Sequence, residues 1–375
     1  MKKITILMLH LRYGGIEKQT ILFANQLCKK YNVEIISVYS MNEKPAYEVD
    51  KKIKIKYLID DAPNRNEFKK ELKSVHLFKT LKEGKKALKI LNDKKKLMIE
   101  EIKNLDCDFV LSTRIEFAEL LSLYAPKHII TMTQEHNHID TPKYIKRVQK
   151  SFCNLDYLVV LGPGSNKNYS KWLKDNKKIK IVEIPNMVEV LSKEKSKLSG
   201  NTLIAVGRMH KIKAFDDLIK VFIEVKNEIK DVKLNLIGSG EEYENLKKQA
   251  KDLNINMPGM LTSEEVKKYM LDSDIYVMTS LSECFPMVLL EASSVGLPLV
   301  SFDVPVGPKA IINDSKNGYL IPNRDIDEMA KKIVYLLKNR ETMNKMGSTS
   351  YNDAKKYLPV NVMKKWYEIF DSKEK

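Results

Sequence analysis

The sequence has few cysteines and no long hydrophobic segment. Its four cysteines, Cys28, Cys107, Cys153 and Cys284, stand far apart and none has CxxC spacing, so neither a zinc site nor a disulfide framework is predicted. The longest early apolar run, residues 4–11, is far shorter than the ~18–20 residues of a membrane-spanning helix. No small-residue cleavage site follows the basic start, so no signal peptide is predicted. We therefore expect a reduced, cytoplasmic compartment.

Acidic residues are also in deficit. Lysine and arginine total 65 against 49 aspartates and glutamates, a net charge of +16. Such a surplus favours an acidic partner, namely nucleic acid, an anionic membrane surface or a phosphorylated substrate; the alternative is a surface covered with solvated lysines. The excess is mostly lysine and shows no alternation with aromatic residues, so nucleic acid is not predicted as a partner.

Residues 66–104 concentrate this charge, with eleven lysines between Lys69 and Lys96 and a break expected at Gly84. Apolar residues fall on one helical stripe. One interpretation is a basic amphipathic surface in peripheral contact with the anionic inner face of the cell membrane. The other, which we favour slightly, is an ordinary pair of surface helices.

The order of elements predicts an α/β protein. A strand at residues 3–9, a glycine-containing turn, a helix and a strand at residues 33–38 form a βαβ unit, which indicates a parallel sheet. The length favours two domains. We predict an N-terminal domain (1–190), a polar linker (191–200), a C-terminal domain (201–357) and a terminal helical segment (358–375).

The most informative stretch is residues 274–298. An apolar strand at residues 275–278 precedes a loop that carries Glu283. Pro286 suits the first position of a helix that carries Glu291 and stops near Gly296. The start of a helix presents unpaired N–H groups that favour an anion. Two carboxylates on either side of such a site predict a nucleotide-sugar pocket.

Other candidates also follow strands. Arg208 and Lys213 lie on a strand-to-helix loop, where a guanidinium and an ammonium group can bind a diphosphate; a solvated basic turn is the alternative. The turn at Gly238 can approach a nucleotide, and residues 256–260, which include Met260, are expected to form a tight loop. His136 lies at a strand's C-terminal end, where open α/β sheets bind ligands. An alternative is that His136 and His138 bind a metal ion, but no carboxylate or cysteine at suitable spacing supports it.

Taken together, these segments resemble the family 4 glycosyltransferases, which are retaining enzymes of the GT-B fold. The matching segments are V-G-R-M-H-K-I-K-A-F (206–215), I-G-S-G (237–240), P-G-M (258–260), S-E-C-F-P-M-V-L-L-E-A (282–292), N-G-Y-L-I (317–321) and, in the first half, G-G (14–15), E-H-N (135–137) and I-P-N (184–186). The resemblance spans nearly the whole chain. It implies two doubly wound Rossmann-like domains with the donor between them, and a last helix that crosses back to the first domain.

The resemblance also implies a role for each matching residue. Arg208 and Lys213 would stabilise the leaving diphosphate, and Glu283 would contact the donor sugar. Glu291 would hold the ribose hydroxyls, and His136 would face the donor sugar near the reacting centre. The remaining donor-binding positions implied are Gly14, Gly15, Gly238, Met260, Phe285, Pro286 and Met287.

Three positions depart from the family pattern. Ala214 replaces a frequent glycine, which is harmless if its φ is negative. Cys284 replaces another glycine and narrows the room beside the donor. Ala310 stands where an acidic residue is common. Two D-x-D sequences, at 106–108 and 272–274, lie at helix-to-strand junctions, where we expect capping rather than metal binding.

The resulting prediction is a retaining, metal-independent hexosyltransferase without a cofactor. It would move a hexose or N-acetylhexosamine from a nucleotide sugar, preferably UDP-linked, to a lipid-linked or polysaccharide acceptor in cell-surface glycan synthesis. The alternatives are a UDP-sugar 2-epimerase, for which no convincing acid–base carboxylates are seen, and a non-catalytic partner subunit of the same fold.

Overall fold

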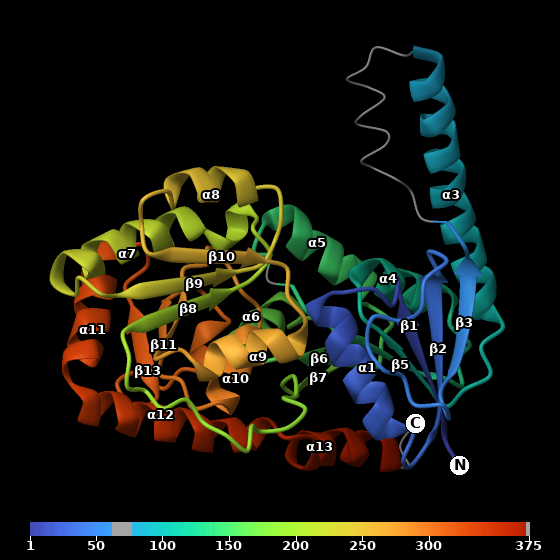
Figure 1. Ribbon diagram of the computed structural model, residues 1–375. Helices are drawn as coiled ribbons and strands as arrows, with labels where there is room; N and C mark the ends of the chain where they lie inside the picture. The colour runs from blue at the N-terminus through green and yellow to red at the C-terminus, as the bar shows by residue number, and fades with distance from the viewer. Residues whose placement is uncertain (62–76, 138, 373–375) are drawn as a thin grey trace. The chain divides into compact units, whose positions relative to one another are not determined.

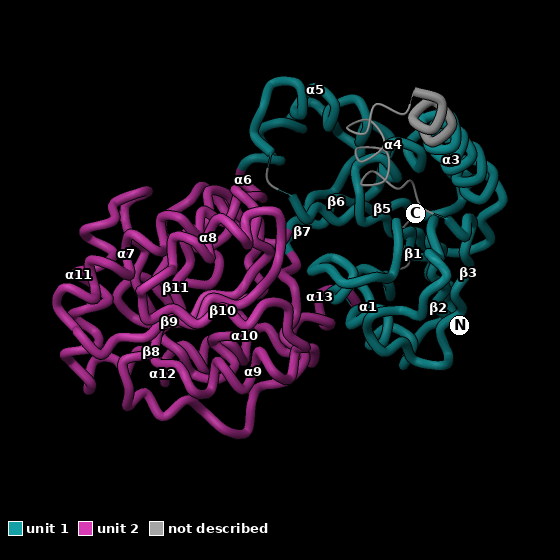
Figure 2. The backbone as a smooth tube through the Cα atoms, turned by 45° about the horizontal axis from the view of Figure 1, so that its top comes forward, with its two compact units in different colours: residues 1–160, 168–183, 368–375 teal, residues 161–167, 184–367 magenta. Residues whose placement is uncertain are grey.

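The computed structural model describes residues 1–61, 77–137 and 139–372, and it divides the chain into two compact α/β units. Unit 1 consists of residues 1–160, 168–183 and 368–375, and unit 2 of residues 161–167 and 184–367 (Figure 2). The predictions for residues 66–76, the first part of the lysine-rich region, and for His138 lie outside the described residues.

Unit 1 is built on a seven-stranded parallel sheet in the order β3-β2-β1-β4-β5-β6-β7 (Figure 1). Its strands are β1 (Lys3–Met8), β2 (Asn32–Tyr39), β3 (Lys54–Ile59), β4 (Phe109–Ser112), β5 (Ile130–Gln134), β6 (Tyr157–Val160) and β7 (Lys180–Glu183). Its helices are α1 (Gly15–Leu27), α3 (Leu77–Lys103), α4 (Ile115–Tyr124), α5 (Pro142–Ser151) and most of α6 (Pro163–Trp172).

Unit 2 repeats the plan with a six-stranded sheet in the order β10-β9-β8-β11-β12-β13. Its strands are β8 (Thr202–Val206), β9 (Lys233–Ile237), β10 (Ile255–Gly259), β11 (Ile275–Met278), β12 (Leu299–Phe302) and β13 (Gly318–Ile321). Its helices are α7 (Phe215–Glu228), α8 (Tyr243–Gln249), α9 (Ser263–Leu271), α10 (Met287–Ser294), α11 (Ile326–Lys338) and α12 (Arg340–Ala354), with short 3₁₀ turns η1 (Lys211–Lys213), η2 (Pro308–Ala310) and η3 (Lys355–Tyr357). Helices α7 and α8 lie on one side of this sheet and α9, α10 and α12 on the other (Figure 1).

Both sheets reverse their strand order at one point, between β1 and β4 and between β8 and β11. In doubly wound sheets, ligands bind beside such a reversal at the C-terminal ends of the strands. The predicted fold class, two doubly wound Rossmann-like units, is confirmed.

The boundary lies somewhat earlier than the sequence suggested. Residues 191–200, predicted as a linker, are part of unit 2. The N–H groups of Ser192 and Ser196 donate to the carbonyls of Ser294 (3.0 Å) and Val295 (2.9 Å), so this polar segment is fixed to the unit that follows it. Helix α13 (Pro359–Asp371) starts in unit 2 and ends in unit 1, where Phe370 packs edge-on against Phe109, with ring centroids 5.0 Å apart.

Three local expectations were wrong, and two elements were missed. Residues 256–260 are largely strand β10, because an edge strand with a shift in register tolerates a proline. Gly84 does not break α3, which runs through it. Strand β3 and helix α12 were not predicted. Pro286 precedes α10 instead of opening it, with an extended ψ of 101°.

The D-x-D sequence at 272–274 caps a strand. The Asp274 carboxylate is buried and accepts hydrogen bonds from the N–H groups of Gly200 (2.9 Å) and Thr202 (2.8 Å). Asp272 is exposed at the end of α9. The carboxylate of Asp274 therefore stabilises the start of β8.

We expect Asp274→Asn to lower the free energy of unfolding of unit 2 by about 2 kcal/mol, because one buried N–H group loses its acceptor. Chemical denaturation of the whole chain measures it, with exposed Asp272→Asn as the control. Equal losses in both variants would contradict the strand-capping role.

Candidate functional site

The central contact of unit 2 joins two loops at the C-terminal edge of its sheet. Lys213 ends the 3₁₀ turn after β8, and Glu283 lies in the loop between β11 and α10. The Lys213 Nζ and Glu283 Oε1 atoms are 2.5 Å apart, with side chains 22% and 14% exposed. Because β8 and β11 are parallel neighbours, residues 70 positions apart meet here. The structure thus brings together two of the predicted catalytic residues.

Two residues that sequence reasoning missed hold these loops in place. The Thr279 hydroxyl donates to the carbonyls of Lys213 (3.2 Å) and Ala214 (3.0 Å). The Arg324 guanidinium donates in turn to the carbonyls of Thr279 (2.6 Å) and Ser280 (3.0 Å). No local sequence signal marks either residue, since their partners are 44 to 66 positions away.

Glu291 lies in α10 and is partly buried. Burial raises the pKa of Tyr276, a hydrogen bond with Val206 lowers it, and the charges of Glu291 and Glu283 raise it further. Both glutamates therefore lie near the Tyr276 side chain. Arg208 follows β8 and is exposed, on the same loop as Lys213.

The side chains between the two glutamates point into the core. Cys284 and Phe285 are each 7% exposed. The Cys284 sulfur lies 3.8 Å from the Ser165 hydroxyl, and the Phe285 ring packs edge-on against Tyr357 at 5.8 Å. These two positions, and buried Pro286, therefore offer mainly their backbone to a ligand, whereas Met287 is partly exposed.

At two positions, close packing between loops explains why the residue is glycine. Gly238 has φ +142°, and a Cβ there would lie 1.9 Å from the carbonyl oxygen of Gly207. A Cβ at Gly307 would lie 2.7 Å from that of Glu283. Each glycine lets one site loop contact the backbone of another. Met260 follows β10 and is 61% exposed.

Unit 1 places Gly14 and Gly15 at the start of α1. Gly14 has an extended φ of 170°, so its backbone conformation does not require glycine. A Cβ there would instead lie 2.0 Å from the Glu17 carboxylate. The Tyr47 hydroxyl holds the Gly14 backbone on both sides, since it donates to the Gly14 carbonyl and accepts from the Gly14 N–H, both at 3.3 Å. Gly15 faces open space.

His136 follows β5 in unit 1, and its Nε2 atom is buried without a hydrogen-bond partner among the described residues. Burial, aided by the charge of Arg114, lowers the pKa of His136 to about 4, so the imidazole is neutral at physiological pH. Its neighbour Glu135 is buried and accepts a hydrogen bond from the Tyr144 hydroxyl at 2.6 Å. The substrate roles of the predicted site residues in both units remain predictions.

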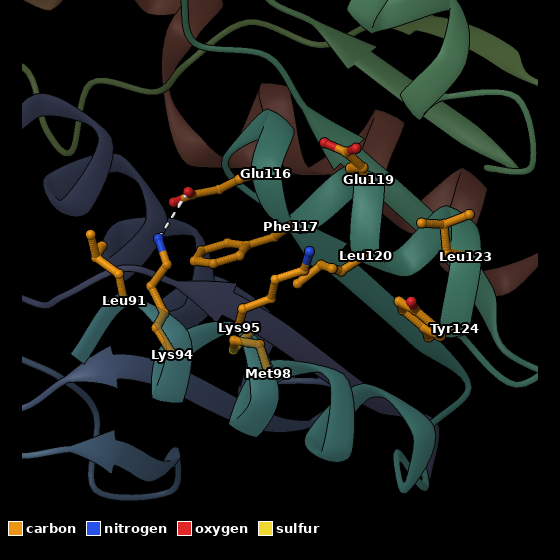
Figure 3. A pocket seen from close by; sticks show the side chains of 10 residues that line it. All are labelled: Leu91, Lys94, Lys95, Met98, Glu116, Phe117, Glu119, Leu120, Leu123 and Tyr124. Atoms are coloured by element: carbon orange, nitrogen blue, oxygen red, sulfur yellow. Dashed lines mark hydrogen bonds and ion pairs between the residues drawn. The ribbon is translucent and has the colours of Figure 1, made fainter. Parts of the chain in front are cut away.

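A separate cavity of about 290 Å³ lies between α3 and α4 (Figure 3). Lys94 pairs across it with Glu116 at 2.9 Å. Its rim includes Leu91 and Leu123, which are 45% and 62% exposed. None of the predicted site residues lines it.

Comparisons with known proteins agree with this geometry. Residues 186–353 match the family model "Glycosyl transferases group 1". The chain is 29% identical to an uncharacterized glycosyltransferase of Haemophilus influenzae, over 98% of this chain and 100% of the relative. It is 31% identical to the poly(ribitol-phosphate) alpha-N-acetylglucosaminyltransferase of Staphylococcus aureus, over 51% of this chain but 40% of that protein.

Among solved structures, a mutant of S. aureus TarM in complex with fondaparinux, alpha-GlcNAc-glycerol and UDP has a TM-score of 0.76 at 19% identity, covering 99% of this chain and 100% of that chain. This likeness establishes the fold. The second unit is thus a glycosyl transferases group 1 domain. The chain as a whole has the fold of the GT-B glycosyltransferases.

The condition that Ala214 is harmless, a negative φ, is not met. Its φ is +46° and its ψ +47°, the left-handed region that disfavours residues with a Cβ. We expect Ala214→Gly to raise the free energy of unfolding by about 0.5–1 kcal/mol. Ala250→Gly is the matched control, because Ala250 also terminates a helix and is also 8% exposed, but has a φ of −76°. The Ala250→Gly variant should have a lower free energy of unfolding than the wild type. A higher free energy of unfolding in Ala250→Gly, or a lower one in Ala214→Gly, would contradict the argument.

The lowered pKa of His136 predicts a pH-dependent stability. Below pH ~6.5 the unfolded chain binds a proton that the folded chain refuses until about pH 4. Stability should therefore fall as the pH decreases through this window. Thermal unfolding between pH 4 and 8 should give a flatter profile for His136→Gln than for the wild type. Parallel profiles would show that the imidazole is not held neutral.

Proposed function

We propose that the chain is a retaining, metal-independent glycosyltransferase that uses a nucleotide-sugar donor, preferably UDP-linked. The observation that carries the proposal is the 2.5 Å contact between Lys213 and Glu283, on the loop that also presents Arg208. All three belong to the glycosyltransferase domain that the family model matches. The sugar transferred would be a hexose or N-acetylhexosamine.

The charges define the chemistry of the donor site. Cleavage of the bond between sugar and diphosphate leaves negative charge on the leaving oxygen. Arg208 and Lys213 would stabilise that charge without a metal ion. Glu283, fixed by Lys213, would accept hydrogen bonds from sugar hydroxyls, and Glu291, farther along α10, would hold the ribose. His136, which is neutral, would donate or accept one hydrogen bond at the sugar without adding charge.

The acceptor is proposed to be a polysaccharide or lipid-linked saccharide in cell-surface glycan synthesis. The S. aureus relative is named for transfer of N-acetylglucosamine to poly(ribitol-phosphate), and the TarM complex holds both UDP and alpha-GlcNAc-glycerol. Those names support a UDP-sugar donor, an α-linked product and a polymeric acceptor.

We also propose that the protein acts at the cytoplasmic face of the membrane. Within the described part of the chain, no helix has the length and apolar character needed to cross a bilayer. Helix α3 carries exposed Leu88 and Leu91 among its lysines, which supports peripheral contact with anionic lipid. Sedimentation with anionic liposomes at low and high salt tests this contact, and no salt-sensitive binding would exclude it.

A donor panel tests the enzymatic proposal. The full chain is incubated with UDP-, GDP- and ADP-sugars, and nucleotide release and thermal stabilisation are measured. We expect a response to UDP-sugars above the others. A folded protein that responds to none of them would exclude a nucleotide-sugar transferase; conversion of one UDP-sugar into its 2-epimer would instead support the epimerase.

Single substitutions test the assigned site. Glu283→Gln and Lys213→Ala should each reduce turnover by about 10²–10³-fold, because they remove groups placed at the developing charge. Initial rates with the best donor measure this. Lys211→Ala, at an exposed lysine of the same turn, is the control and should keep the wild-type rate. Wild-type rates in both site variants would remove this assignment.

A further inference from the structure

Unit 1 gathers cationic and imidazole groups at the C-terminal edge of its sheet. His10 and Arg12 follow β1, Arg114 follows β4 and His136 follows β5. We call these four residues the Arg114 cluster. Strand β4 lies between β1 and β5 and is parallel to both, so the three strand ends adjoin.

Carboxylates beside the cluster are Glu17, Glu43 and, next to His136, buried Glu135. Glu17 is buried and is shared by Arg114, with Nη2 3.3 Å from Oε1, and His10, with Nδ1 3.6 Å from the same oxygen. Arg12 pairs with Glu43 at 3.0 Å, where both side chains are about half exposed. One carboxylate thus serves a guanidinium and an imidazole.

Two buried polar atoms of the cluster have no hydrogen-bond partner among the described residues, namely Arg114 Nε and His136 Nε2. A guanidinium has five donors, and the Arg114 group spends one of them on a long contact with Glu17. Buried donors are almost always satisfied in folded proteins. The unpartnered Nε–H group of Arg114 at the end of a parallel sheet therefore indicates a ligand that accepts from it.

The helix ends beside Arg114 indicate the sign of that ligand. Burial lowers the pKa of both His10 and His136; the charge of Arg114 lowers the pKa of His136 further, whereas at His10 the Glu17 carboxylate, which raises the pKa, has a larger influence than Arg114. The N-termini of α1 and α4 begin at this edge, at Gly15 and Ile115, and add positive partial charge. An anion with several oxygen acceptors, such as a phosphate, suits a guanidinium fork beside helix N-termini.

We propose that the two guanidinium groups of the Arg114 cluster, Arg12 and Arg114, bind a phosphate group of the acceptor substrate while His136 faces the donor sugar, so that the acceptor is a phosphate-bearing polyol or saccharide. This inference rests on the proposed function and names the class of its acceptor. The cations proposed for the donor diphosphate, Arg208 and Lys213, belong to unit 2. Arg12 and Arg114 of unit 1 have no role in the proposed donor site. Glu17 holds Arg114 in place and competes with the phosphate for it.

The experiment measures binding of sn-glycerol 3-phosphate to the full chain by titration calorimetry at constant ionic strength, with glycerol and UDP as further probes. The wild type should bind glycerol 3-phosphate and not glycerol. Arg114→Gln should weaken this binding at least tenfold, and Arg114→Lys should weaken it less. The matched control is Arg147→Gln, because Arg147 makes a similar 3.3 Å contact with Glu119 in the same unit; it should bind like the wild type.

A second variant covers the case in which Arg114→Gln does not fold. Glu17→Gln removes the competing carboxylate and should tighten glycerol 3-phosphate binding several-fold, a gain that a purely structural ion pair would not produce. Unchanged or weaker binding in this variant contradicts the proposal.

Three further results would overturn the inference. They are no binding of glycerol 3-phosphate by the wild type, wild-type binding by folded Arg114→Gln, and an equal loss of UDP binding in that variant. The last would assign the cluster to the donor diphosphate. Nucleotide release by the wild type from UDP-sugars without a phosphate acceptor tests the proposed function separately.

Discussion

The ion pair between Lys213 and Glu283 is the contact on which the organisation of the second unit depends. It is possible because β8 and β11 are adjacent and parallel, so that the loops after them emerge at the same edge. Both partners are mostly buried, and a buried charge without its partner is strongly destabilising. Each side chain therefore fixes the other before any substrate arrives. The donor would then meet a carboxylate and an ammonium group already oriented, which lowers the cost of ordering them during binding.

The backbone around this pair is arranged so that side-chain chemistry can be presented at the loops. Gly307 lies against Glu283 and Gly238 against Gly207, each so closely that a Cβ would overlap the neighbouring chain. Thr279 and Arg324 bond to loop carbonyls, and Arg324 also pairs with the Asp217 carboxylate at 3.0 Å. Such contacts leave the functional groups of Arg208, Lys213 and Glu283 for the ligand. The left-handed conformation of Ala214 fits the same picture, because strain at a functional loop persists when the surrounding contacts fix it.

Much of this fold follows from local sequence, and the exceptions have physical causes. The buried strand at residues 275–278 was predicted because it is a short apolar run between turn signals. Strand β3 was missed because its sequence, K-I-K-Y-L-I, is partly charged at an edge of the sheet, and β10 because it contains a proline. In the site, Lys213 and Glu283 were predicted from motif resemblance. Thr279, Arg324 and Arg114 were not, since each acts through a partner 44 or more positions away that only the sheet topology brings near.

The positions of the arginines distinguish the cations at the strand ends from the excess of lysine in the chain. Only seven of the 65 cationic residues are arginine, and four of those seven follow a strand within four residues: Arg12 after β1, Arg114 after β4, Arg208 after β8 and Arg324 after β13. A lysine-rich chain gains solubility and surface charge from either residue, so net charge alone does not explain this placement. The guanidinium differs from the ammonium group in offering a planar set of donors to two acceptors at once. Arg324 uses that property on two carbonyls, whereas Arg114 keeps a buried donor unused. Arg324 therefore serves the fold, whereas the unpaired donor of Arg114 is the one we propose for a substrate.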